Sequence, residues 1–195
     1  MSLKMKRMEN KLMIKLVVGT EAMFFLALIM AYIYFSFLPG YSPQQADHLD
    51  IRSTSIFSAF LFSSSFTFWR AETNFNKGKM RRLKGWLLLT LVLGLIFLVG
   101  QGTEYARLLR ENVSVGSSLF GTSFFTLTGF HGLHVFAGLV VISIITALTF
   151  LGDYDRSTSS VFGTVGIYWH FVDIVWLFVF FIVYVLPHLH NTSGR

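Results

Sequence analysis

Five long apolar segments dominate the sequence, and their lengths restrict the chain to few folds. The hydrocarbon core of a bilayer is about 30 Å thick, so a helix needs about 20 apolar residues to cross it. Inside hydrocarbon the backbone must satisfy its own polar groups, which favours helices for runs of this length. The pattern predicts an all-α, polytopic membrane bundle of five transmembrane helices that forms a single domain over residues 1–195. The predicted helices cover residues 16–38, 54–70, 85–104, 119–151 and 161–187.

The composition argues against a water-soluble globular protein. Of 195 residues, 53% are hydrophobic and 13% are charged, which leaves too little polar surface to cover a soluble domain of this size. The formal net charge of +6 does not indicate nucleic-acid binding, because the basic residues lie in loops between the apolar segments. Segment 54–70 is the weakest of the five predictions, since it is short and rich in Ser and Thr. Those hydroxyls can bond within their own helix or to a neighbouring helix.

Lys and Arg are distributed unequally between the two predicted sides of the membrane. Twelve of the 16 fall on the side of the N-terminus, so the positive-inside rule places the N-terminus in the cytoplasm and the C-terminus outside. A dense basic cluster follows the second predicted helix and has two interpretations, anionic lipid binding or topology determination alone. The residues assigned to the lipid interface are Arg70, Arg81, Arg82, Trp69, Trp86 and Glu104.

Ionisable residues inside the predicted spans need an explanation, because each costs about 2.5–3.5 kcal/mol to insert into hydrocarbon. The candidates are Glu21, His131, His134, His170 and Asp173.

Glu21 is the most informative of these residues, because its own helix offers it no partner. The side chains three and four positions away are Val17, Val18, Phe24 and Phe25. Either Glu21 is protonated or another helix supplies a donor. We predict a contact with the imidazole of His170 or His134, which fall at suitable depths. The group would then handle protons or, alternatively, make one structural hydrogen bond.

Two polar pairs lie on the fourth and fifth predicted helices. His131 and His134 are three residues apart, as are His170 and Asp173, so each pair shares a helix face. Helical bundles can build metal or haem sites from such pairs. The predicted spans lack the four Glu and the Glu-x-x-His repeats of a di-iron bundle, so we expect no metal. The alternative is interhelical hydrogen bonding by His170, Asp173 and the neighbouring Trp residues.

Four motifs in the chain resemble those of the cytochrome c oxidase subunit III family. Residues 124–135, FFTLTGFHGLHV, and residues 168–178, YWHFVDIVWLF, resemble its two longest signatures. Residues 21–25, EAMFF, resemble the family's helix with a carbodiimide-reactive glutamate, and residues 101–105, QGTEY, add a further match. Together these motifs extend over nearly the whole chain.

The resemblance implies a fold, a set of partners and an absence of catalysis in this chain. Subunit III is an accessory subunit that binds phospholipid and supports assembly and proton uptake by catalytic subunit I, which holds the haems and copper. On that basis Glu21 corresponds to the reactive glutamate, and this chain binds neither metal nor haem. The expected partners are subunit I, other oxidase subunits and membrane lipids, with no nucleic acid, in the bacterial inner membrane. Five predicted helices match the family's shorter form and lack the first two helices of the seven-helix form.

The sequence leaves several alternatives open. Related five-helix subunits occur in quinol oxidases and with nitric oxide reductase, and the electron donor is determined mainly by other subunits. A stand-alone metal or haem enzyme would use the histidine pairs. A stand-alone transporter would need a continuous polar path, which the outer halves of the first and fifth predicted helices do not offer.

Overall fold

The computed structural model describes residues 3–39, 41, 49–116, 118–152 and 159–187, and within them all side chains except those of residues 3–11 and 159–160. This part of the chain is helical and contains no β-strand, which confirms the predicted all-α class. The elements in order are α1 (Leu3–Ser36), α2 (Ile51–Asn76), α3 (Met80–Arg110), α4 (Leu119–Leu151), α5 (Ser159–Phe180) and the π-helical turn η3 (Phe181–Val185).

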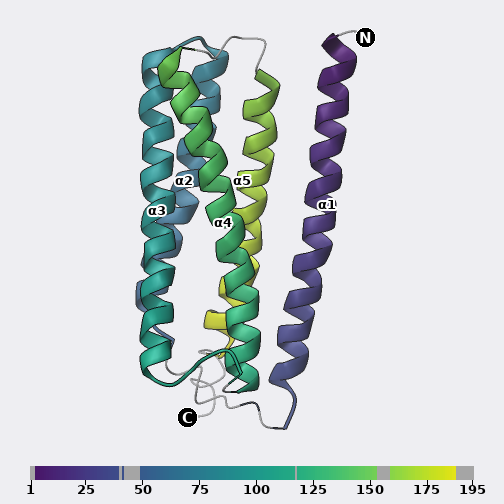
Figure 1. The fold of residues 1–195 in the computed structure, drawn as a ribbon, viewed down its shortest axis with the longest axis vertical. Coiled ribbons are helices and arrows are strands. Elements are labelled where there is room, and N and C mark those ends of the chain that lie inside the picture. The colour runs from purple at the N-terminus through teal and green to yellow at the C-terminus, as the bar shows by residue number, and fades with distance from the viewer. Residues whose placement is uncertain (1–2, 40, 42–48, 117, 153–158, 188–195) are drawn as a thin grey trace.

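Successive helices run in opposite directions along one bundle (Figure 1). Helices α2 and α3 form a hairpin with the most extensive contact between any two elements. Helix α5 packs on α1, α2 and α4, while α4 also contacts α3. Helix α1 stands at one flank, where α4 and α5 are its main neighbours (Figure 1).

Within the described residues, four helices are long and apolar enough to cross a membrane, through Leu12–Ser36, Met80–Arg110, Leu119–Leu151 and Val161–Val185. Helix α2 is not among them, although its 26 residues correspond to about 39 Å at the usual rise per residue. The prediction over 54–70 covers only the middle of α2. Helices α1 and α3 likewise extend beyond the predicted 16–38 and 85–104, because Lys, Arg, Glu and Met are good helix formers outside hydrocarbon.

The hydroxyls of α2 explain how a helix this polar is accommodated against α5. The indole Nε1 of Trp176 donates to Ser58 Oγ at 2.8 Å, and that of Trp169 donates to Ser64 Oγ at 3.1 Å. Each serine hydroxyl in turn donates to a backbone carbonyl of its own helix. Both routes expected for these hydroxyls, within the helix and between helices, are therefore used at once.

Close packing of α4 on α5 depends on Gly138. A Cβ at this position would lie 2.7 Å from the indole ring of Trp169, whose side chain is fully buried. A methyl group would overlap a rigid ring that is also held by its hydrogen bond to Ser64. The absence of a side chain at Gly138 thus sets how closely the two helices approach.

Candidate functional site: the buried polar groups of the bundle

Glu21 on α1 meets His134 on α4. The carboxylate Oε2 lies 3.0 Å from the imidazole Nε2, and both side chains are half-buried. The rings of Phe24 and Phe25 flank the imidazole, with centroid distances of 6.3 Å and 4.9 Å. The predicted contact between Glu21 and an imidazole is therefore present, and His134 is the partner instead of His170.

The hydrogen bond of His134 Nδ1 determines how many protons the Glu21–His134 pair needs. Its Nδ1 lies 2.7 Å from the backbone carbonyl of Phe130, which can only accept, so Nδ1 carries a hydrogen. The 3.0 Å contact to Glu21 then needs one further proton, placed either on the carboxyl or on Nε2. A carboxylate beside a neutral imidazole in this tautomer would set two acceptors against each other. The pair is thus a site that holds one proton and is electrically neutral when occupied.

His131 lies one turn from His134 but in a different environment. Its ring is 0% exposed and stacks on Trp176, with centroids 4.7 Å apart and an interplanar angle of 26°. The edges of Phe25 and Phe97 complete the enclosure. Neither ring nitrogen has a hydrogen-bond partner among the described residues. The two histidines therefore have different contacts: His134 contacts α1, and His131 is enclosed in the interior of the bundle.

His170 and Asp173 also differ from each other. His170 Nδ1 and the Ser65 hydroxyl are 2.9 Å apart and join α5 to α2. Asp173 is 5% exposed, and neither of its carboxyl oxygens has a hydrogen-bond partner in the described part of the chain. Interhelical bonding by His170 and the neighbouring tryptophans is confirmed. For Asp173, the Ser65 hydroxyl on α2 is the interhelical group that interacts with its carboxyl.

Metal-binding geometry is not found among the described residues, where no three His, Cys, Asp or Glu side chains gather as a possible ligand set. The reason lies in the directions of the side chains. His134 turns to α1 and His131 to Trp176, while His170 bonds to α2.

Glu72 is a polar group that the sequence prediction missed, because the predicted helix ended at residue 70. It lies on the last turns of α2, half-buried against α5. Its carboxyl oxygens lie 3.6 Å and 3.5 Å from the points where Cβ atoms would sit on Gly163 and Gly166. The spacing of Phe68, Ala71 and Phe75, which are all buried, is the signal that could have extended the helix.

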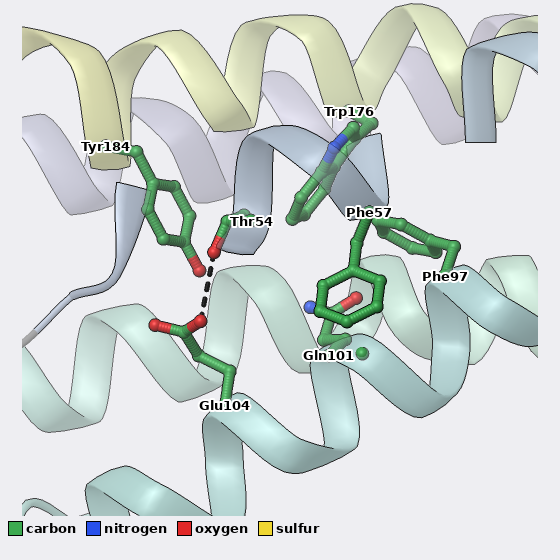
Figure 2. A pocket seen from close by; sticks show the side chains of 8 residues that line it. Thr54, Phe57, Phe97, Gln101, Glu104, Trp176 and Tyr184 are labelled. Atoms are coloured by element: carbon green, nitrogen blue, oxygen red, sulfur yellow. Dashed lines mark hydrogen bonds between the residues drawn. The ribbon is translucent and has the colours of Figure 1, made fainter. Parts of the chain in front are cut away.

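Glu104 was predicted at the lipid interface, and the structure corrects this. Its side chain is 7% exposed and lies between α2 and α3. The Thr54 hydroxyl donates to Oε2 at 2.9 Å (Figure 2), while the Asp50 N–H and the Arg107 guanidinium donate to Oε1 at 3.2 Å and 2.8 Å. Three donors compensate for burying the carboxylate.

Asp50 extends this network to the start of α2. Its Oδ1 accepts from the backbone N–H groups of Arg52 and Ser53, which caps the helix. The Ser53 hydroxyl donates to Oδ2 at 2.6 Å. Hydrogen bonds from the side chain and backbone of Ser53 lower the pKa of Asp50 below its ordinary value, and the N–H of Arg52 adds to them.

The basic residues near the α2–α3 turn are arranged on aromatic rings. The Arg70 guanidinium lies 5.6 Å from the ring centroid of Trp86, and Lys84 Nζ lies 4.9 Å from that of Phe150. Arg81, Arg82 and Trp69 are exposed. Aromatic rings thus hold two of the cations in place on this end of the bundle.

The described part of the chain has four long apolar helices and the hydroxyl-rich helix α2. Carboxyl and imidazole groups lie within its mainly apolar core. These features define a multi-pass helical membrane protein. The family described as cytochrome c oxidase subunit III matches this chain over residues 5–187. The chain belongs to the cytochrome c oxidase subunit III family, as its motifs predicted.

Curated relatives with the same description cover most of the chain. A probable cytochrome c oxidase subunit 3 of Mycobacterium leprae is 33% identical over 86% of this chain and 83% of its own length. One from Nocardia farcinica is 35% identical over 85% of this chain and 82% of its own length. Cytochrome c oxidase subunit 3 of Synechocystis is 36% identical over 85% of this chain and 71% of its own.

Membership defines the general role of the chain. It is an accessory subunit of a haem-copper oxidase, associates with other oxidase subunits and takes part in the respiratory chain.

Proposed function

We propose that this subunit supports proton uptake by catalytic subunit I, and that Glu21 and His134 form its proton-holding pair. The observation that carries the proposal is the 3.0 Å contact between Glu21 Oε2 and His134 Nε2, with Nδ1 committed to the Phe130 carbonyl. This geometry requires one shared proton. Both side chains remain half-buried, so the pair is not sealed off within this chain.

The position of the pair favours uptake from the basic end of the bundle. Glu21 lies in the first half of the apolar stretch Leu12–Ser36. The α2–α3 turn, with Arg81 and Arg82, lies at the same end as the start of α1 (Figure 1). The positive-inside rule makes this the cytoplasmic end, with the C-terminus outside. This topology requires α2 to be a fifth span, which its length and its hydroxyl bonds to α5 support.

Phospholipid binding belongs to the same proposal. Exposed Arg81 and Arg82, together with Arg70 on Trp86, give this end a positive surface at the level where anionic headgroups would lie. Trp69 adds an exposed aromatic ring of the kind found at membrane interfaces. We place the subunit in the bacterial inner membrane, with haem and copper held by subunit I and none by this chain.

The test uses the assembled oxidase with Glu21→Gln. Glutamine can still donate to His134 Nε2, so we expect normal assembly together with slower proton uptake and earlier inactivation during turnover. Glu111→Gln, which changes an exposed acid beyond the end of α3, is the matched control and should behave as wild type. Copurified subunits and a haem spectrum identify the parent complex.

One result would remove the proposal. If oxygen reduction, proton uptake and turnover lifetime were unchanged in Glu21→Gln and also after deletion of the whole subunit, its role would be architectural only.

A further inference from the structure

Four polar side chains form a row between α2 and α5. His170 and Asp173 are three residues apart on α5 and share a face of that helix. Ser65 and Glu72 are seven residues apart on α2, which is about two helical turns. Since α2 and α5 run in opposite directions (Figure 1), the row leads from Glu72, near the α2–α3 turn, to Asp173 in the interior of the bundle.

Asp173 is the member of this row whose burial is unexplained. Its side chain is 5% exposed, and neither carboxyl oxygen has a hydrogen-bond partner among the described residues. An ionised carboxylate in this position would be a buried charge without a compensating donor. We therefore expect Asp173 to hold a proton, which lets its carboxyl donate one hydrogen bond.

Ser65 lies between Asp173 and His170. Its hydroxyl is 2.9 Å from His170 Nδ1 and also interacts with the Asp173 carboxyl. A hydroxyl can accept one hydrogen bond while it donates another. Ser65 can thus accept from a protonated Asp173 and donate to Nδ1. It can equally accept from an Nδ1–H and donate to an Asp173 carboxylate.

Glu72 connects the row to the basic end of the bundle. Its half-buried carboxyl lies over Gly163 and Gly166, which are the two glycines that precede His170 on α5. From α2, Glu72 is the charged group that acts electrostatically on His170. A carboxylate in this position can stabilise the imidazole while it carries an additional proton.

The other titratable groups packed against α5 are occupied elsewhere. Helix α1 brings Glu21, which contacts His134 on α4. Helix α4 also brings His131, which stacks on Trp176. In the described part of the chain, none of these three groups acts electrostatically on His170 or Asp173.

We propose that Asp173, Ser65 and His170 form a proton-binding site that exchanges with water at His170. To release a proton, Asp173 passes its hydrogen to Ser65 Oγ while Ser65 passes its own to His170 Nδ1. The imidazole, already protonated at Nε2, then gives the Nε2 proton to water. Asp173 is left as a carboxylate that accepts from the Ser65 hydroxyl, and loading is the reverse.

The burial of the members sets the direction of exchange. His170 is half-buried, whereas Asp173 is buried, so water reaches the imidazole first. One turn beyond Asp173 on this face of α5 is Trp176, whose N–H is bonded to Ser58. The row therefore ends at Asp173, and the site stores a proton instead of conducting one across the bundle.

Infrared spectroscopy of the assembled oxidase in deuterated water tests the proposal. A protonated carboxyl has a carbonyl stretching band that shifts when its hydrogen is exchanged for deuterium. We expect one such band in wild type that is absent in Asp173→Asn. The band should persist in Ser65→Ala but exchange about tenfold more slowly or less, the effect of losing one hydrogen bond. Ser65→Thr keeps a hydroxyl and should exchange as wild type does.

Ser63→Ala is the matched control, because it removes an exposed hydroxyl of α2 and should leave the exchange rate unchanged. If Asp173→Asn does not assemble, the band is identified as the one slowed in Ser65→Ala and restored in Ser65→Thr. No exchangeable band in wild type overturns the proposal, as does equal exchange in Ser65→Ala and wild type. The proposed pair on α1 and α4 is tested separately, since Glu21→Gln should leave this band and its exchange unchanged.

Discussion

Glu21 and His134, separated by 113 positions in the sequence, are joined by a 3.0 Å contact between α1 and α4. Helix α1 stands at the flank of the bundle and exposes much of its apolar surface. The contact is therefore both the proposed proton-holding group and a polar anchor for the helix at the flank of the bundle.

Replacing the imidazole should loosen this anchor more than replacing the acid with its amide. His134→Leu leaves a half-buried carboxyl without a partner, which typically costs about 1–3 kcal/mol. Glu21→Gln keeps a donor for Nε2. We expect the thermal midpoint of the chain in detergent to fall in His134→Leu and to stay close to wild type in Glu21→Gln. Equal midpoints in the two variants would show that the contact does not anchor α1.

The hydroxyl of Ser58 should stabilise the contact between α2 and α5. Ser58→Ala removes the acceptor of the Trp176 N–H, and interhelical bonds of this kind contribute about 0.6–2 kcal/mol in membrane proteins. Unfolding in mixed micelles measures the loss. Ser63→Ala is the control, since that exposed hydroxyl donates to the Ala59 carbonyl of its own helix. A loss as large in the control would mean that the helix itself, not the contact, had changed.

Filling the space at Gly138 should push α4 away from α5. The added Cβ of Gly138→Ala would lie 2.7 Å from the Trp169 ring, and such overpacking costs about 1–3 kcal/mol. Gly102→Ala is the matched control, because nothing lies within 4 Å of its added Cβ. Alanine favours a helix over glycine by about 1 kcal/mol. The free energy of unfolding, measured with a chemical denaturant, should fall in Gly138→Ala and rise in Gly102→Ala. Unchanged stability in Gly138→Ala would show that the helices can separate at no cost.

The cap of α2 at Asp50 should make the stability of the folded protein depend on pH in the acid range. Hydrogen bonds from Ser53 lower the pKa of Asp50 in the folded state below its ordinary value of 3.8. The stabilisation is fully present above that value and is lost as the pH falls through the lower folded pKa.

Asp50→Asn keeps a side chain that can cap α2 but removes the ionisable carboxyl. Asparagine caps helices about as well as aspartate, so its thermal midpoint should match wild type at pH 6 and fall less between pH 4 and pH 2. Asp50→Ala should lose about 1 kcal/mol at pH 6, and its deficit relative to wild type should shrink as the pH falls below the folded pKa of Asp50. The same acid dependence in Asp50→Asn as in wild type would assign the effect to another carboxyl.

Hydropathy and spacing predicted much of this fold. The long apolar segments and the imidazole contact of Glu21 could be inferred because both follow from the cost of burying charge. The partner of Glu21 could not be fixed, since depth along a helix does not determine how that helix is rotated. His134 faces α1, while His131, one turn away, faces Trp176.

The errors have physical causes that a sequence does not show. Glu104 lies at the end of the predicted span 85–104, where an acid usually meets water. In the structure α3 continues to Arg110, and Thr54 and Arg107 bring donors from two elements and allow burial of Glu104. Glu72 was missed because Arg70 was taken to end the helix, although Phe75 continues its buried face. The π-helical turn at Tyr184 has no local signature.

The serines of α2 also bear on how the chain enters the membrane. The oxygens of Ser64 and Ser58 accept hydrogen bonds from the indole N–H groups of Trp169 and Trp176. Both tryptophans lie on α5, which the ribosome makes long after α2. Until then α3 is the main partner available to α2, and we expect the two to insert together as a helical hairpin. The completed fold would then depend on α5 arriving last and closing over a segment already in place.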